Sequence, residues 1–369
     1  MTKLKQPITF RRGLTFKNRI VMAPMTTCMS FFDGVITKDE REYYALHSGE
    51  VGAVITGAAN IQEVGKTWEG QLGVYHDRFI PGLAKLAGAI KREGTKAILQ
   101  IFHGGRMTNS KILRGEQPVS ASAIPAERPD AETPRELSST EVIDVINSYR
   151  QATVRAIKAG FDGVEIHGAN TYLIQQFFSP HSNRRTDEWG GTREKRFKFV
   201  SEVVDAVTQT VDESDVNEFI VGYRFSPEEF ETPGIRLEDT LYLIDRLADK
   251  PLDYLHISFN DYQRVAISEA YQDKPIIDYL YKKIDGRIPF IGVGDIQTKQ
   301  QTEEVLKTAD LVALGKALLI DPHWTKKVFA EREDLVRTEL SEYEREELMI
   351  ENGVWAFLER MIPDRLIKK

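Results

Sequence analysis

A short polar run, HGANTY at residues 167–172, brings together side chains that could polarise a carbonyl group and supply a proton. His167 and Asn170 stand at i and i+3, so their N–H donors could converge on one oxygen atom. Polarising a carbonyl oxygen draws electron density from a conjugated C=C, and a hydride can then add at the β carbon. The phenol of Tyr172 could protonate the α carbon. We predict that His167, Asn170 and Tyr172 form the substrate-facing, catalytic wall of a reductase site.

Two alternatives for His167 stay open at this point. A lone histidine at a strand end is often a structural residue whose hydrogen bonds are satisfied inside the protein. Glu165 and His167 are two residues apart and could both point inward as metal ligands, but no second histidine is close in sequence. The neighbouring Asn170 and Tyr172 favour the catalytic interpretation, and we predict no metal site.

Gln100 and Arg224 each end a predicted strand and suit the edge of a flavin ring. The pyrimidine edge of a flavin offers paired donors and acceptors, which a carboxamide can match on both sides. Reduction leaves negative charge near that edge, and a fixed guanidinium would stabilise this charge. The alternative is that Arg224 pairs structurally with a carboxylate such as Glu165.

Two glycine-containing pairs, Gly294-Asp295 and Gly315-Lys316, follow the last two predicted strands. Barrels commonly hold a phosphate at this place through backbone N–H groups that glycine leaves accessible. The ammonium group of Lys316 could add a positive charge. The alternative is that both glycines only serve tight turns between strand and helix.

The elements that must position these residues alternate between short apolar runs and longer amphipathic ones. The apolar runs are nearly continuous, as expected for strands buried on both faces of a parallel sheet. Eight such runs cover residues 20–23, 53–56, 97–102, 163–167, 219–224, 254–258, 289–293 and 311–314. Helix patterns between them cover residues 38–49, 79–90, a stretch opened by the capping-box pattern Ser138-x-x-Glu141, 193–210, 238–249, 276–283 and 299–307.

Eight strands, each followed by a helix, predict an α/β protein with a (β/α)8 TIM barrel. A doubly wound sheet is disfavoured because no G-x-G-x-x-G turn follows an early strand. Long loops at 103–137 and 168–191 follow strands three and four, and residues 8–16 form an N-terminal hairpin that could plug the opposite end. We expect one domain over residues 1–369, with 322–369 a helical C-terminal extension whose Trp355, Phe357 and Leu358 pack on the barrel or on another subunit.

The composition excludes several classes of protein. A net charge of −7 without a basic stripe argues against nucleic-acid binding. No apolar run is long enough to cross a bilayer, and the polar start lacks the apolar core of a signal peptide, so we expect a cytoplasmic protein. The single cysteine, Cys28, excludes an internal disulfide, a cysteine-based zinc site and a four-cysteine iron–sulfur cluster.

Four motifs together resemble the old yellow enzyme family of NAD(P)H-dependent flavin oxidoreductases, over about residues 7–324. They are KNRIVMAPMT at 17–26, QIFHGGR at 100–106, GVEIHGAN at 163–170 and FSPHSNRRTDEWGG at 178–191. The resemblance implies a (β/α)8 barrel with tightly but non-covalently bound FMN, which NADH or NADPH reduces and a second substrate reoxidises in the same pocket.

The resemblance also implies roles for particular residues. His167 and Asn170 would bind the activating oxygen of the substrate, and Tyr172 would donate the proton. Thr26 would bond near the flavin C4 carbonyl and tune the potential. The remaining cofactor contacts would come from Pro24, Met25, Ala58, Gln100, Arg224, Gly294, Asp295, Gly315 and Lys316.

Three positions depart from the family pattern. The family usually has arginine where Lys316 stands, so the phosphate contact would lose its bidentate fork. Asp295 would put an unusual negative charge near the phosphate, so we assign the contact to its backbone N–H. Some relatives carry a redox-tuning cysteine at the position of Thr26, but Cys28 lies two residues later and that role does not transfer.

The sequence therefore predicts an FMN-dependent oxidoreductase that reduces the activated C=C of an α,β-unsaturated carbonyl or a similar electrophile. The alternatives are an NADH oxidase or a flavin or quinone reductase, a non-catalytic flavoprotein redox sensor, and a metal-dependent barrel hydrolase. Expected partners are a small-molecule electrophile, a nicotinamide cofactor and, in a homo-oligomer, further copies of the chain. Candidates to recognise the extra phosphate of NADPH are Arg114, Arg128 and Arg135.

Overall fold

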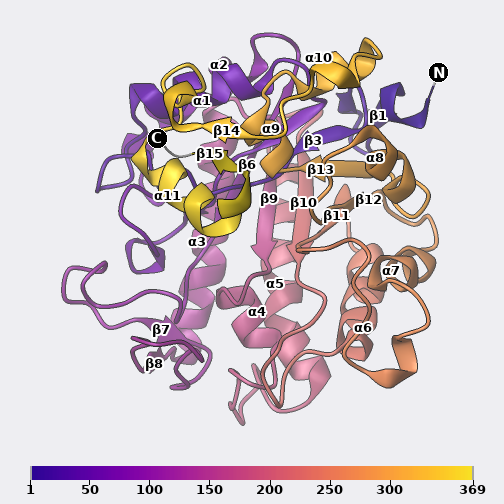
Figure 1. Cartoon of the computed structure of the whole chain (residues 1–369). Helices are drawn as coiled ribbons and strands as arrows, with labels where there is room; N and C mark the ends of the chain where they lie inside the picture. The colour runs from indigo at the N-terminus through magenta and orange to yellow at the C-terminus, as the bar shows by residue number, and fades with distance from the viewer. Residues whose placement is uncertain (1, 368–369) are drawn as a thin grey trace.

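Eight parallel strands close into a barrel in the computed structural model, which describes residues 2–367 (Figure 1). The strands are neighbours in the order β4, β3, β13, β12, β11, β10, β9 and β6, and the pairing of β4 with β6 closes the ring. Their bounds are Ile20–Met22 (β3), Ala53–Ile55 (β4), Lys96–Phe102 (β6), Gly163–Gly168 (β9), Ile220–Phe225 (β10), Tyr254–Ile257 (β11), Phe290–Gly292 (β12) and Leu311–Leu314 (β13). The predicted (β/α)8 barrel is confirmed, and each strand ends within one residue of its predicted bounds.

The near-continuous apolar runs form barrel strands because both of their faces are covered. In β9, β10 and β11 every residue is buried. One face packs against the surrounding helices and the other fills the barrel interior. Gly163 shows how tightly the strands pack, since a Cβ there would lie 2.5 Å from the backbone oxygen of Ile220 on the neighbouring strand.

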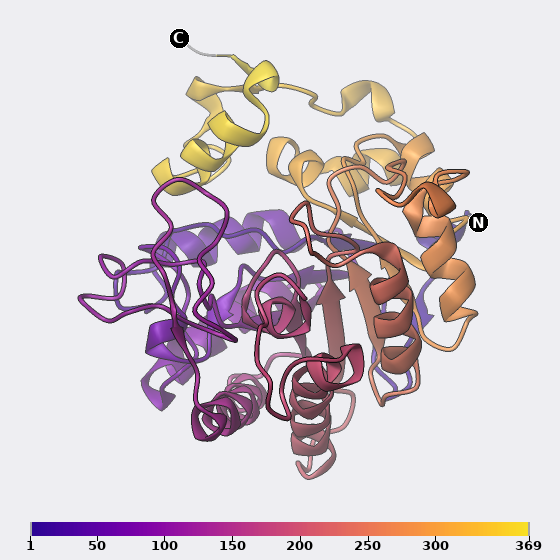
Figure 2. The ribbon, with the colours of Figure 1, turned by 90° about the horizontal axis from the view of Figure 1, so that it is seen from below.

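Helices surround this ring, as Figures 1 and 2 show. The capping box predicted at Ser138 is present: the Glu141 N–H donates to Ser138 Oγ at 3.3 Å, and the Ser138 N–H donates to Glu141 Oε2 at 2.8 Å. The helices are Lys38–Ser48 (α1), Ile80–Lys91 (α2), Ser139–Lys158 (α3), Leu173–Phe178 (α4), Arg193–Asp212 (α5), Leu237–Ala248 (α6), Ile276–Ile284 (α7), Lys299–Val305 (α8) and Lys316–Ile320 (α9). Single turns of 3-10 helix lie at Lys3–Lys5, Glu63–Gly65, Asp77–Phe79, Glu269–Tyr271, Glu333–Leu335, Glu342–Glu344 and Pro363–Arg365.

The predicted N-terminal hairpin is present as β1 (Ile8–Thr9) and antiparallel β2 (Thr15–Phe16). The ring of Phe10 lies 6.1 Å from the ring of Tyr254, the first residue of β11. Arg12 Nη1 donates to Asp253 Oδ2 at 2.6 Å. The hairpin therefore packs at the end of the barrel where its strands begin.

The connections after β4 and β6 and the C-terminal segment contain additional elements. Strand β5 (Ala59–Asn60) pairs with the end of β6, and β7 (Val119–Ser120) pairs with β8 (Arg135–Glu136) in the loop after β6. The C-terminal segment contains α10 (Trp324–Phe329) and α11 (Asn352–Met361), and also a parallel pair, β14 (Leu340–Ser341) with β15 (Leu366–Ile367), that we did not predict. Among the described residues, no helix combines the length and apolar character needed to cross a membrane.

Candidate active site

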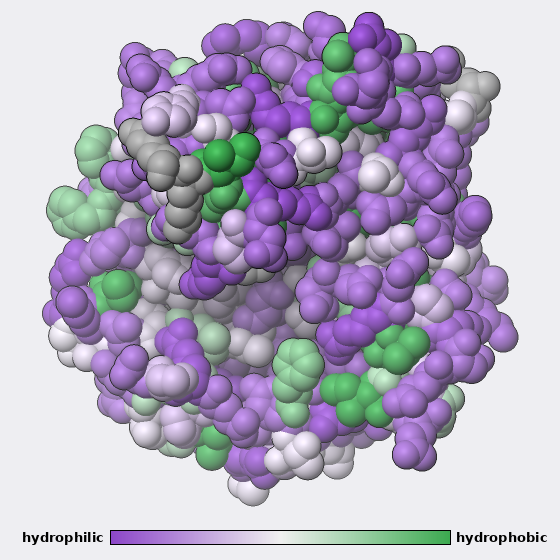
Figure 3. All heavy atoms as spheres, in the orientation of Figure 1, coloured by the Kyte–Doolittle hydropathy of each residue, from purple (hydrophilic) through white to green (hydrophobic). Residues whose placement is uncertain are grey.

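A cavity of about 1010 Å³ opens at the carboxyl ends of the barrel strands. The space-filling view shows a hollow near the centre of the face seen in Figure 1 (Figure 3). The predicted site residues line the cavity, with the exception of Gly294. The residues that we predicted separately along the sequence therefore line the same cavity.

His167, one residue before the end of β9, is a neutral hydrogen-bond donor that lines the cavity. The Ala169 N–H donates to His167 Nδ1 at 3.2 Å, so the ring carries its proton on Nε2. Burial, together with the charge of Arg224, holds the pKa of His167 well below its usual value. The ring therefore stays uncharged and offers Nε2–H to a ligand.

Asn170 is fixed by two serines from neighbouring strand ends. Its backbone has φ +56°, a left-handed conformation that asparagine tolerates better than most residues. The Asn170 N–H donates to Ser226 Oγ at 2.9 Å, and Ser258 Oγ donates to Asn170 Oδ1 at 2.7 Å. The amide oxygen is thus occupied, which leaves the Nδ2 donors for a ligand.

Tyr172 stands beside His167 in an aromatic corner. Its ring lies edge-on to the rings of His167 at 4.9 Å, Phe102 at 5.0 Å and Trp68 at 6.1 Å. Burial raises the pKa of Tyr172, and the positive charges of Arg224, Arg128 and Arg360 oppose that rise without cancelling it. The phenol therefore keeps its proton at neutral pH. Trp68 lines the cavity too, although no pattern in its own segment indicated this.

Gln100 and Arg224 lie over a buried polar pair inside the barrel. Glu165 is fully buried and accepts from Gln100 Nε2 at 2.7 Å and His256 Nδ1 at 2.8 Å. Burial alone would raise the pKa of Glu165, but His256, Arg224 and the hydrogen bonds around it together lower that pKa. The carboxylate supplies a negative charge close to Arg224.

The structural alternative for Arg224, an ion pair with Glu165, does not form within the described residues. Arg224 is 8% exposed, and its Nε is buried with no hydrogen-bond partner. A buried donor without an acceptor costs about 1–3 kcal/mol. An acceptor such as a flavin N1–C2=O edge would remove this cost.

The predicted phosphate end is built from the segments after β12 and β13. Gly294 has φ +141°, and a Cβ there would lie 2.4 Å from the backbone N of Tyr262, so only glycine allows this close approach. Lys316 Nζ forms an ion pair with Asp295 Oδ1 at 3.1 Å. The ammonium group of Lys316 is therefore already partly neutralised, which the sequence did not indicate.

Pro24, Met25 and Thr26 follow β3 and line the same cavity as Ala58. The two segments touch, because a Cβ on Gly57 would lie 2.7 Å from the backbone oxygen of Met25. The buried, unpartnered Arg224 donor, the glycine-dependent turn and the carboxamide of Gln100 together fit an FMN. Among the described residues, no group of three or more His, Cys, Asp or Glu side chains is gathered for a metal ion.

The C-terminal helix α11 also lines the cavity, through Gly353, Ala356, Phe357 and Arg360. It contacts the half-buried Cys28, which is itself a cavity residue. We predicted packing on the barrel or another subunit for this segment and missed its place in the site. No local periodicity could have revealed a contact between residues so far apart in the chain.

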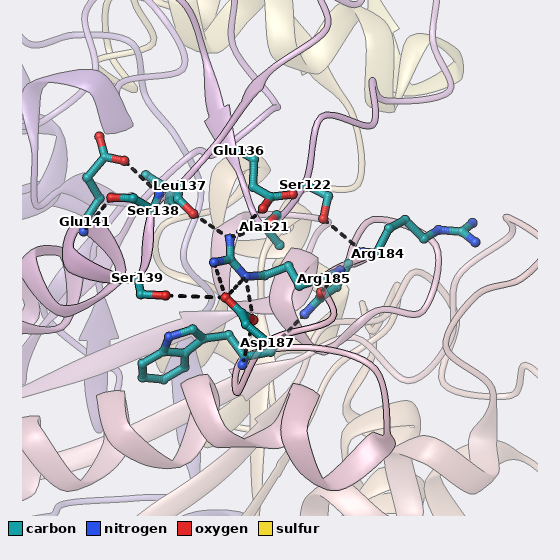
Figure 4. A network of polar contacts seen from close by, with 12 residues as sticks. Ala121, Ser122, Glu136, Leu137, Ser138, Ser139, Glu141, Arg184, Arg185 and Asp187 are labelled. Carbon is teal, nitrogen blue, oxygen red and sulfur yellow. Dashed lines mark hydrogen bonds and ion pairs between the residues drawn. The ribbon is translucent and has the colours of Figure 1, made fainter.

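The motif at 178–191, in contrast, is a clamp outside the cavity (Figure 4). Arg185 donates to the carbonyl oxygens of Ala121 at 3.1 Å and Leu137 at 2.5 Å, and its Nη2 pairs with Asp187 at 2.6 Å. The Arg184 N–H donates to Ser122 Oγ at 3.0 Å. These contacts tie the loop after β9 to the loop after β6, so both long loops are held in place.

Comparison with known proteins gives a family match over residues 3–334, to the NADH:flavin oxidoreductase / NADH oxidase family. Among solved structures, the old yellow enzyme homologue from Zymomonas mobilis is similar with a TM-score of 0.77 and 28% identity, over 89% of this chain and 92% of that one.

Two curated relatives extend the comparison. The NADH:acrylate oxidoreductase of Vibrio harveyi is 44% identical over 99% of this chain and 36% of its own length. The probable NADH-dependent flavin oxidoreductase YqiG of Bacillus subtilis is 42% identical over 95% of this chain and 94% of its own length. The chain thus spans little more than a third of the first relative and nearly all of the second.

Proposed function

Because the chain belongs to the NADH:flavin oxidoreductase / NADH oxidase family, the family of old yellow enzyme, we propose that it reduces the activated C=C of an α,β-unsaturated carbonyl compound. The family consists of FMN-dependent NAD(P)H oxidoreductases. The observation that carries the finer proposal is the wall of His167, Asn170 and Tyr172. It offers two neutral N–H donors beside a protonated phenol on one side of the cavity.

A bound FMN, reduced by a nicotinamide, would supply the hydride. Arg224 and Gln100 would hold the pyrimidine edge of the ring, with Pro24, Met25, Thr26 and Ala58 around it. The phosphate would lie at Gly315, Lys316 and the backbone N–H groups of Gly294 and Asp295. Lys316 would have to share its charge between the phosphate and Asp295, from which it is 3.1 Å away.

The wall would act on the second substrate in two ways. His167 Nε2–H and Asn170 Nδ2–H would bind the carbonyl oxygen and stabilise the negative charge that develops on it. Tyr172 Oη would give its proton to the α carbon. Burial lowers the pKa of His167, so the imidazole stays neutral near neutral pH. The carbonyl oxygen would therefore accept a hydrogen bond from an uncharged Nε2–H.

We propose NADH as the preferred reductant, because NADH is the nicotinamide named for the related NADH:acrylate oxidoreductase of Vibrio harveyi and for YqiG of Bacillus subtilis. Recognition of the extra phosphate of NADPH needs a free cation. Two of the three candidate arginines are engaged: Arg114 pairs with Glu69 at 2.6 Å, and Arg135 pairs with Glu141 at 2.8 Å. Of the three, only Arg128 has no ion pair within the described part of the chain.

The test is an anaerobic stopped-flow experiment on the purified protein loaded with FMN. Reduction is followed with NADH and with NADPH, and reoxidation with a series of enones, quinones and oxygen. We expect faster reduction by NADH and fastest reoxidation by an enone. A colourless protein that takes up no FMN refutes the proposal, and reoxidation by oxygen or quinone alone would favour the NADH oxidase alternative.

A further inference from the structure

One face of helix α11 forms a wall of the cavity. The residues that line the cavity are Gly353, Ala356, Phe357 and Arg360, at i, i+3, i+4 and i+7. This spacing places all four residues on one side of an α-helix. The opposite side is anchored, since Leu358 is fully buried and the guanidinium of Arg345 lies 5.0 Å from the ring centre of Trp355.

Close backbone packing holds this wall against the segment that follows β3. A Cβ on Gly353 would lie 2.8 Å from the backbone oxygen of Thr27 and 2.9 Å from Cys28 Cβ. Only glycine permits this approach at that position. In Figure 2 the yellow C-terminal segment, which contains α11, lies to one side of the barrel. The family match ends at residue 334, before this helix begins at Asn352.

Some of the charged side chains that line the cavity pair with one another, but Arg360 does not. Four cationic side chains line it: Arg224, Arg264, Lys316 and Arg360. Arg264 pairs with Glu228 at 3.1 Å, and Lys316 pairs with Asp295 at 3.1 Å. Within residues 2–367, neither Arg224 nor Arg360 forms an ion pair. Arg224 is buried and would bind the proposed cofactor, so Arg360 is the described cation of the cavity that remains available to a second ligand.

The position of Arg360 relates it to the catalytic wall. Burial raises the pKa of Tyr172 and the pKa of Cys28, and the positive charge of Arg360 lowers both pKa values in part. Three carboxylates that line the cavity have no lysine or arginine partner within the described residues, namely Glu127, which lies 3.8 Å from His181 Nε2, Glu229 and Glu231. An anionic ligand is therefore attracted to Arg360 and repelled by these carboxylates.

We propose that Arg360 binds an anionic oxygen group of the ligand that reacts over the cofactor, and so selects charged ligands over neutral ones. A guanidinium presents a planar pair of N–H donors that matches both phosphate and carboxylate. The group is either the diphosphate of the nicotinamide dinucleotide or a carboxylate on the unsaturated acceptor. The inference rests on the proposed function, because it assumes that both ligands use this cavity.

The test compares Arg360→Gln with the wild type in FMN-loaded protein. One arm measures half-saturation for flavin reduction by NADH and by 1-benzyl-1,4-dihydronicotinamide, a hydride donor without phosphates. The other arm measures dissociation constants for cinnamate and its neutral amide by calorimetry without turnover. Arg360→Lys keeps the charge but not the fork. Arg92→Gln is the matched control, because Arg92 is exposed at the end of α2 and outside the cavity.

We expect Arg360→Gln to weaken the binding of one of the two anionic ligands by about fivefold, which is the scale of one exposed charge pair. Binding of the matching neutral compound should weaken by less than twofold. Weaker binding of NADH would show that Arg360 binds the diphosphate. Weaker binding of cinnamate would show that it binds the carboxylate. Arg360→Lys should recover part of the loss, and 1 M salt should abolish the difference through screening. Equal affinities of wild type and Arg360→Gln in both arms overturn the proposal. If the wild type is reduced by NADH yet reacts with no enone, the proposed function fails while the NADH arm still tests Arg360.

Discussion

Two regions at and after the end of β9 differ in whether their polar atoms have hydrogen-bond partners. In the wall at 167–172, His167 Nε2 and the Tyr172 hydroxyl have no hydrogen-bond partner in the described chain, and both residues line the cavity. In the clamp at 178–191, Arg185 is 3% exposed at its side chain and is saturated by Asp187 and two backbone carbonyls. Only a few residues separate the two regions.

The difference teaches that a specific motif is not by itself a functional one. The clamp has the longest and most distinctive sequence of the four motifs, yet it lies outside the cavity. Its arginine stabilises two loops, whereas the shorter wall motif presents donors to a ligand. The mutations below should therefore divide into those that slow the chemistry and those that lower stability.

The largest effect is expected for Tyr172→Phe. Removing the hydroxyl removes the proton donor, and general acid catalysis typically contributes about 10²–10⁴-fold. We expect reoxidation by an enone to slow by about 10³-fold, while flavin reduction by NADH and the melting temperature stay nearly unchanged. Stopped-flow measurement of both half-reactions checks this. Equal slowing of the two half-reactions would contradict a proton-donor role.

Mutations in the clamp should lower the stability of the protein and leave the chemistry unchanged. Arg185→Ala leaves two backbone carbonyls and Asp187 without their donor, and we expect the free energy of unfolding to fall by about 3 kcal/mol. Its neighbour Arg184 has an exposed side chain, so Arg184→Ala should change it by less than about 0.5 kcal/mol. Urea denaturation measures both. If the folded fraction of Arg185→Ala keeps NADH reduction but loses enone reduction, the division between wall and clamp is wrong.

The Lys316–Asp295 pair lies between these extremes, because it lines the cavity but is already paired. Its side chains are 29% and 43% exposed, so solvent screens the attraction. We expect Lys316→Ala to weaken FMN binding by about fivefold and Asp295→Asn to strengthen it by a similar factor. Fluorescence titration of the apoprotein with FMN gives both constants. Weaker binding by Asp295→Asn would show that the carboxylate does not compete with the phosphate.

The smallest effect is expected for pH. Burial lowers the pKa of His167 well below its usual value of 6.5 and raises the pKa of Tyr172 above its usual value of 10. His167 therefore stays neutral as pH falls to about 6.5, and Tyr172 stays protonated as pH rises to about 9. The single-turnover rate of enone reduction should be flat across this window. A change in this rate with a midpoint between pH 7 and 8 would mean that His167 or Tyr172 titrates within this window.

Much of this site could be predicted because its residues end buried strands. Apolar runs predicted each barrel strand to within one residue, and a polar residue near the C-terminal end of a run then had a known place at one end of the barrel. His167, Gln100 and Arg224 follow directly from this logic. The hairpin and the capping box at Ser138 also have local signatures.

The contributions that could not be predicted depend on contacts between distant segments. Ser226 and Ser258 fix Asn170 from two other strands, and Gly353 meets Cys28 from the far end of the chain. The pairing of Lys316 with Asp295 is likewise a product of the turn geometry after β12 and β13. None of these contacts leaves a periodic pattern in either segment.

The place of α11 in the chain has a consequence for how the protein is made. During synthesis all eight barrel strands leave the ribosome before residues 352–361. The β4–β6 pairing that closes the ring needs nothing from α11. The barrel can therefore close while its cavity still lacks the wall that α11 forms.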